Sequence, residues 1–83
     1  MLKEIIEQYQ DDELLIAEGF EDAIIGVVED FNAPIRIAYS VKKCLNILEK
    51  DMNEFDAMEF FIYNVIGGYV GIKTPIWVWD NFN

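Results

Sequence analysis

The first thirty residues of the chain contain ten carboxylates and only one cation, Lys3. Residues from Phe31 onward contain six acids and five bases, so the first segment carries nine of the ten net negative charges. The ten acids are Glu4, Glu7, Asp11, Asp12, Glu13, Glu18, Glu21, Asp22, Glu29 and Asp30. Contiguous carboxylates are normally hydrated, and the front of the chain is therefore predicted to form a solvated face that is electrostatically one-sided.

The composition as a whole is apolar for a small domain. Of the 83 residues, 53 % are hydrophobic and five more are glycine, whereas soluble domains have roughly 45–50 % on the combined count. A chain of this length forms a single domain, 1–83, with much of its mass close to the surface. Part of the apolar surplus is therefore expected to be exposed or to be buried against a partner, either another protein or a second copy of the chain.

The first half of the chain is predicted to form a helix followed by a hairpin. Residues 1–18 are interpreted as an acidic helical appendage, because helical spacing relates four of its apolar residues. These residues are Leu2, Ile5, Ile6 and Tyr9. Residues 23–28 and 34–39 are rich in β-branched side chains and are predicted strands. The turn-forming residues 29–33 between them suit an antiparallel connection.

Two helices and a third strand are predicted after the hairpin. Ser40 is placed to cap a helix over 41–51, and Asn53 is placed to cap a second helix over 53–67. The second helix carries an apolar stripe at helical spacing that includes Phe55, Met58, Ile62, Val65 and Tyr69. Residues 75–79 form the last strand, opened by a proline. The predicted fold class is α+β, a three-stranded, mainly antiparallel sheet packed against two helices, with an acidic N-terminal helix.

The sequence contains no catalytic or metal-binding signature. Cys44 is the only thiol, it lies on the apolar stripe of its helix, and the chain has no histidine to act as its base. A buried small hydrophobe is therefore favoured over a reactive thiolate. The acidic runs lack the alternating oxygen ligands and glycine of a calcium loop. We therefore predict no catalytic residue, no metal and no cofactor.

Direct binding to nucleic acid or to a membrane is disfavoured. Six cations on a chain of net charge −10 do not provide the clustered Lys and Arg that neutralise phosphates. The longest stretch without a charge, 60–72, is 13 residues long, and a membrane-spanning helix needs about 20. The first residues turn acidic at once and do not resemble a secretory signal, so a cytoplasmic protein is expected.

Several blocks of residues from Gly19 onward form sequence motifs that are found in other proteins. They are GFEDAIIGV at 19–27, YS-x-x-KCL-x-IL at 39–48, DMN-x-FDA at 51–57, F-x-IYNV-x-GGYVG at 60–71 and TPIW at 74–77. In these blocks the chain resembles a family of small uncharacterised proteins of bacteriophages and prophages. Ser40 and Phe55 stand where that family commonly has acids, and residues 1–18 look peculiar to this chain. The resemblance implies a phage-derived protein of the host cytoplasm with a family-like core at 19–83, and it implies no catalytic residue.

A non-enzymatic, phage-type interaction module is the function that these observations favour. It would engage a host or phage protein through an acidic face and through apolar surface on the last strand. The expected contact residues are Asp11, Asp12, Glu13, Glu18, Glu21, Asp22, Trp77 and Trp79. The two tryptophans fit ordinary core packing equally well.

Two other functions remain open. Carboxylates on a small protein can take the place of phosphates, so the alternative is a nucleic-acid-mimicking inhibitor of a host defence or DNA-processing protein. A small carboxylate-dependent enzyme ranks third, because acids and aromatic residues are both plentiful.

Overall fold

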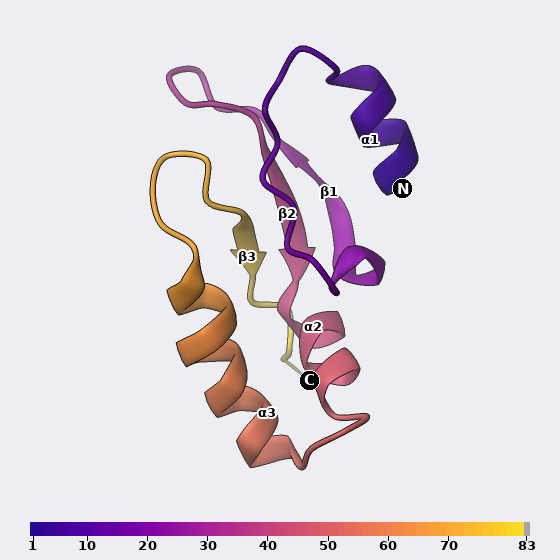
Figure 1. Ribbon diagram of the computed structural model, residues 1–83, viewed down its shortest axis with the longest axis vertical. Helices are drawn as coiled ribbons and strands as arrows, with labels where there is room; N and C mark the ends of the chain where they lie inside the picture. The colour runs from indigo at the N-terminus through magenta and orange to yellow at the C-terminus, as the bar shows by residue number, and fades with distance from the viewer. Residues whose placement is uncertain (83) are drawn as a thin grey trace.

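The three predicted strands form one sheet. The computed structural model describes residues 1–82, and in them β1 (Ile24–Val28), β2 (Arg36–Ser40) and β3 (Ile76–Val78) lie in the order β1-β2-β3 (Figure 1). β1 runs antiparallel to β2 over four residue pairs, and β3 runs parallel to β2 over three. The α+β class is confirmed, and the predicted mainly antiparallel sheet is a mixed one in which the longer of the two ladders is antiparallel. Because β2 is central, β1 and β3 are the two edges of the sheet.

Helices occupy the start and the second half of the chain. α1 spans Leu2–Gln8, α2 spans Val41–Leu48, and α3 spans Glu54–Phe60. After Phe60 the helix continues as a wider π turn, η2 (Phe61–Val65), and then as a 3-10 turn, η3 (Ile66–Gly68); another 3-10 turn, η1 (Glu21–Ala23), precedes β1. The helix predicted over 41–51 thus ends at Leu48. The helix predicted over 53–67 is present, but its hydrogen-bond pattern changes after the first two turns.

Both predicted helix caps are confirmed. The Ser40 hydroxyl accepts a hydrogen bond from the backbone N–H of Lys43 at 3.1 Å. The Asn53 side-chain oxygen accepts one from the N–H of Asp56 at 2.8 Å. A cap of this kind satisfies a backbone donor that the helix itself leaves free, and it contributes about 1 kcal/mol to stability.

The core lies on one face of the sheet. Ile37 and Tyr39 of β2 are buried on that face, and Tyr39 stands beside Trp77 of β3 with their ring centroids 5.3 Å apart. Phe61 of η2 packs edge-on against Trp77 at 5.5 Å. The segment that follows α1 also contacts Tyr39, because the N–H of Ala17 donates a 2.7 Å hydrogen bond to the Tyr39 hydroxyl. The face is therefore covered by η2 together with the extended segment that follows α1 (Figure 1).

The segment predicted as an acidic appendage contributes to this core. Ile5 of α1 is 7 % exposed and Ala17 is fully buried, and both belong to the main hydrophobic cluster. The acidic residues of the segment point to solvent, while a few apolar side chains between them pack inward. The segment is therefore part of the domain in its packing as well as in its connectivity.

The predicted apolar stripe of α3 is wrong for two residues. Phe55 is 71 % exposed and Ile62 is 41 % exposed. The buried residues are Ala57, Phe61 and Val65, which are spaced by four and lie on the neighbouring side of the helix. The sequence has apolar residues along two adjacent sides of this helix, and only one of these sides packs into the core.

The molecule is elongated and exposes more surface than its mass requires. Its principal extents are 39 × 24 × 24 Å, and its accessible area is 5747 Å². A folded monomer of 9.7 kDa is expected to expose about 5,100 Å². The difference, about 600 Å², approaches the roughly 800 Å² that each partner buries in a standard protein interface.

Candidate functional site

The six acidic residues predicted to bind a partner are all exposed, but they form two separate groups. Residues 11–13 follow α1. Glu18 precedes η1, and Glu21 and Asp22 lie within it, at the opposite end of the extended segment that crosses the sheet (Figure 1). Glu13 forms an ion pair with Lys73 at 3.0 Å. Both carboxylate oxygens of Glu21 accept the N–H of Gly19 at 3.1 Å. The acidic residues therefore form two hydrated groups rather than one continuous cluster.

The two tryptophans occupy different environments. Trp77 is half-buried and packs against Tyr39, Phe61 and Tyr69, with ring centroids 5.3 to 6.1 Å apart. Trp79 is 43 % exposed and contacts only the edge of the Phe61 ring, at 6.0 Å, among the aromatic pairs of residues 1–82. Trp77 is thus a residue of the aromatic core, and Trp79 presents much of its indole to solvent.

Asp80 fixes the position of the segment that carries Trp79. The Ser40 hydroxyl donates to Oδ2 of Asp80 at 2.6 Å, and the N–H of Lys42 donates to Oδ1 at 2.9 Å. These two hydrogen bonds, that of Ser40 first, lower the pKa of the Asp80 carboxyl below its ordinary value. The carboxylate lies at the N-terminal end of α2, where the helix dipole also favours a negative charge. Trp79 therefore lies between β3 and Asp80, and the hydrogen bonds of Asp80 fix the backbone on its C-terminal side.

Many exposed apolar residues were not among the predicted contact residues. In residues 1–82, fourteen large hydrophobic side chains are exposed, and Trp79 is the only predicted contact residue among them. The others are Met1, Ile6, Leu15, Ile25, Phe31, Phe55, Phe60, Ile62, Tyr63, Val70, Ile72, Val78 and Phe82. The surplus of hydrophobic residues in the composition predicts that such residues exist, but it does not identify them.

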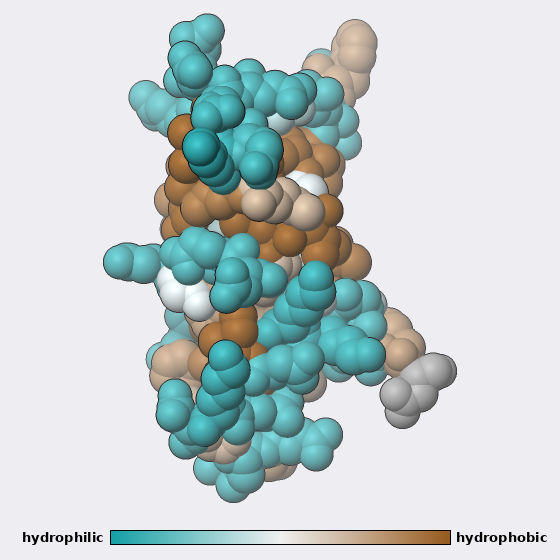
Figure 2. Space-filling model, turned by 90° about the vertical axis from the view of Figure 1, so that its right-hand side faces the viewer, coloured by the Kyte–Doolittle hydropathy of each residue, from teal (hydrophilic) through white to brown (hydrophobic). Residues whose placement is uncertain are grey.

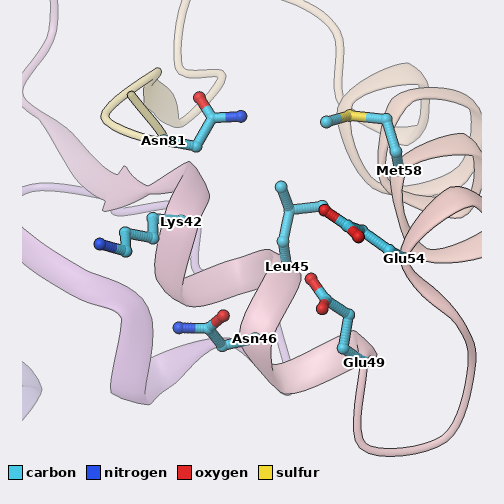
Figure 3. A pocket seen from close by; sticks show the side chains of 7 residues that line it. All are labelled: Lys42, Leu45, Asn46, Glu49, Glu54, Met58 and Asn81. Atoms are coloured by element: carbon cyan, nitrogen blue, oxygen red, sulfur yellow. The ribbon is translucent and has the colours of Figure 1, made fainter. Parts of the chain in front are cut away.

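One pocket lies between α2 and α3. It has a volume of about 220 Å³, and Figure 3 shows Glu49 and Glu54 reaching from the two helices toward Leu45. The full lining is Lys42, Leu45, Asn46, Glu49, Glu54, Met58 and Asn81. Small-molecule sites usually have about 300–1,000 Å³ and are mostly apolar. This pocket is smaller and largely polar, so it gives little support to the enzyme hypothesis.

Nucleophilic and metal chemistry also find little support. Cys44 is buried, and this burial raises the pKa of its thiol to about 12. A thiol of that pKa is almost entirely protonated at neutral pH and is a poor nucleophile. Among residues 1–82, no group of three or more cysteines and acids is arranged to hold a metal ion.

Comparisons of the chain with protein-family models, with curated proteins and with solved structures gave no match. The resemblance to phage proteins therefore stays a prediction. In the part of the chain that the structure describes, no helix is long and apolar enough to cross a membrane.

Proposed function

We propose that this chain is a non-enzymatic protein-interaction module of the bacteriophage type, which acts in the host cytoplasm on a host or phage protein. The observation that carries the proposal is the exposure of fourteen large hydrophobic side chains in residues 1–82 of an 83-residue protein. On one side of the molecule, apolar surface gathers into a band (Figure 2), and contiguous apolar surface on a small protein marks a site of interaction more often than it serves the isolated monomer.

The apolar part of the proposed interface includes Trp79. Its indole is 43 % exposed, and the neighbouring Val78 is 36 % exposed. Tryptophan is enriched among the residues that dominate binding energy, and a tryptophan held by its neighbours loses little conformational freedom on binding. Because Asp80 is anchored to Ser40 and Lys42, Trp79 has the pre-organised position that a binding residue requires.

The acidic part of the proposed interface would increase the rate of encounter with a cationic partner. Among the six predicted acidic contact residues, only Glu13 has an ion-pair partner within residues 1–82. Free carboxylates exert a field on approaching molecules that falls off over about 8 Å at physiological salt. The same field supports the alternative function, mimicry of the nucleic-acid backbone by an inhibitor of a DNA-processing or defence protein. The separation of the two acidic groups favours the more general interaction module.

A capture experiment with salt steps tests the proposal. The protein is immobilised, host lysate is applied at low salt, and the retained proteins are identified after washes of increasing salt. A protein partner that remains bound at high salt is expected, because apolar contacts are not screened by ions. A nucleic-acid-binding protein that is released by salt would instead support mimicry. If no protein is retained at any salt, the proposal is wrong.

Two matched variants assign the captured partner to a surface. Trp79→Ala should reduce the salt-resistant fraction, whereas the triple change Asp11→Asn, Asp12→Asn and Glu13→Gln should reduce only low-salt retention. Phe31→Ala serves as the control, because Phe31 lies in the loop between β1 and β2, at the opposite end of the molecule from the segment that follows β3 (Figure 1). The mass of the purified protein, measured in parallel by sedimentation, shows whether a second copy is the partner.

A further inference from the structure

The outer edge of β1 is not paired with another strand, and α1 lies on the same side of the sheet (Figure 1). The sheet order places β1 at an edge, and its only strand neighbour is β2. Among residues 1–82, no backbone hydrogen bond joins β1 to the chain on its other side. An edge strand of this kind presents free N–H and C=O groups that can pair with a strand of another molecule.

Apolar side chains gather beside this open edge. Figure 2 shows a hydrophobic band over α1 and β1, with hydrophilic surface above and below it. Ile25 of β1 is 39 % exposed and Ile6 of α1 is 46 % exposed, while Leu2 and Val27 are half-buried. A second strand added at the edge would place its own side chains against this band.

Both ends of β1 are anionic. Glu21 and Asp22 precede the strand, Glu29 and Asp30 follow it, and residues 19–35 contain no cation. Asp30 is paired with Arg36 at 2.9 Å, but Glu29 and Asp22 have no ion-pair partner within residues 1–82. The open edge is therefore an apolar strip with negative charge at each end.

We propose that the β1 edge binds an extended segment of another protein, with alternating apolar residues in its middle and Lys or Arg on both sides. This inference rests on the proposed interaction function and adds a second surface, at the sheet edge opposite β3, together with the chemistry of its partner. The free backbone groups of β1 select an extended segment, Ile25 and Ile6 select apolar side chains, and the acids select the basic flanks.

A second copy of the chain fits this edge poorly. Antiparallel pairing of β1 with the β1 of another copy would bring the acids at 21–22 next to those at 29–30 of the other copy. Like charges placed opposite each other destabilise an interface. The acids that discourage self-association thus attract a cationic segment.

The register of the sheet indicates where pairing is regular. The ladder between β1 and β2 slips between Ile24 and Gly26, which leaves Ile25 outside the regular pairs. Such a bulge bends the strand and interrupts pairing at its edge. The partner is therefore expected to make its hydrogen bonds over Gly26, Val27 and Val28, and to contact Ile25 through side chains.

Synthetic peptides test the proposal directly. The probe is a peptide of alternating valine and threonine flanked by two lysines at each end, and its affinity is measured by fluorescence anisotropy. One matched peptide has proline at the central positions, and another has glutamate flanks. The first probe should bind at least about tenfold more tightly than either, and the β1 amides should exchange more slowly with deuterium when it is bound. If the proline peptide binds equally well, the contact is electrostatic only and the proposal is wrong.

Substitutions in the protein complete the test. Ile25→Lys should weaken probe binding by about tenfold or more, while Phe55→Lys, which makes the same charge change at an exposed residue of α3, should leave it within about twofold. Ile6→Lys, at an exposed apolar residue of α1, provides a second variant in case Ile25→Lys does not fold. Equal weakening by Phe55→Lys would overturn the proposal. If Trp79→Ala abolishes capture of a partner from lysate and Ile25→Lys does not affect it, the interaction function stands and the β1 site is wrong.

Discussion

The hydroxyl of Ser40 both accepts and donates a hydrogen bond, and Asp80 is the acceptor. Ser40 accepts the N–H of Lys43 at 3.1 Å and donates to Oδ2 of Asp80 at 2.6 Å, while Oδ1 of Asp80 accepts the N–H of Lys42 at 2.9 Å. One serine therefore joins the end of β2, the first turn of α2 and the segment after β3. These hydrogen bonds connect the ends of the two parallel strands, β2 and β3.

Removing the Asp80 carboxylate should destabilise the domain. Asp80→Ala leaves the N–H of Lys42 and the Ser40 hydroxyl without their acceptor, and the expected loss in unfolding free energy is about 1 to 2 kcal/mol. Urea denaturation followed by tryptophan fluorescence measures this loss. Asp51→Ala is the control, because within residues 1–82 the Asp51 side chain makes no hydrogen bond or ion pair. An equal effect of the two substitutions would contradict the role of Asp80.

The same carboxylate should make stability depend on pH. Its folded pKa lies below its ordinary value of 3.8, because the Ser40 hydroxyl and then the Lys42 N–H donate hydrogen bonds to it. A lowered pKa in the folded state gives stability that is fully present above the ordinary value and is lost as the pH falls toward the folded pKa. We expect the stability difference between wild type and Asp80→Asn to be constant near neutral pH and to shrink below 3.8. A difference that grows on acidification would contradict this assignment.

Tyr39 should anchor the N-terminal segment. Its buried hydroxyl accepts the N–H of Ala17 at 2.7 Å, so Tyr39→Phe leaves a buried donor unsatisfied at an expected cost of about 1 to 3 kcal/mol. Hydrogen exchange should accelerate most at the Ala17 amide. Tyr63→Phe removes a hydroxyl from a side chain that is 74 % exposed, and it should change neither measurement.

Cys44 should be unreactive in the native protein. Burial raises the pKa of its thiol to about 12, so both access and the thiolate fraction are low near pH 8. We expect labelling by a small disulfide reagent to be slow without denaturant and rapid in concentrated urea. Rapid labelling of the native protein would show that α2 opens readily or that the thiol is not buried.

Local sequence signals predicted much of this fold because they act between neighbouring residues. Ser40 and Asn53 were identified as caps from the residues that follow them, and the β1–β2 hairpin from the turn residues between its strands. The exposure of the six acidic residues that are predicted to bind a partner also follows from their density. The caps, the hairpin and the exposed acids can therefore be predicted without knowing which residues far apart in the sequence contact each other.

Other features depend on residues that are far apart in the sequence. The parallel pairing of β3 with β2, the contact between Ala17 and Tyr39, and the anchoring of Asp80 join segments 22 to 40 residues apart. The choice of the buried side of α3 was wrong at Phe55 and Ile62, because periodicity identifies apolar stripes without saying which one meets the sheet. The spacing of Trp77 and Trp79 likewise put them on one side of the strand, but only the packing of Phe61 and Tyr69 separates their roles.

The two tryptophans should therefore respond differently to substitution. Trp77→Ala removes a ring from the aromatic core, and we expect a loss of about 3 kcal/mol or more in stability. Trp79→Ala should lower stability by less and should mainly reduce partner binding, because 43 % of this side chain is already exposed. Thermal unfolding combined with the capture assay separates the two effects. Equal stability losses would show that Trp79 is also a core residue.

We propose that this chain functions by binding another protein through its exposed apolar surface and its acidic segment. Hydrogen–deuterium exchange of the chain, with and without the partner retained in the capture experiment, tests this claim most directly. We expect slower exchange around Trp79 and around residues 11–13 in the complex, with little change at the exposed hairpin tip near Phe31. Exchange that is unchanged around both Trp79 and the acidic segment, in a chain that has bound its partner, would contradict it.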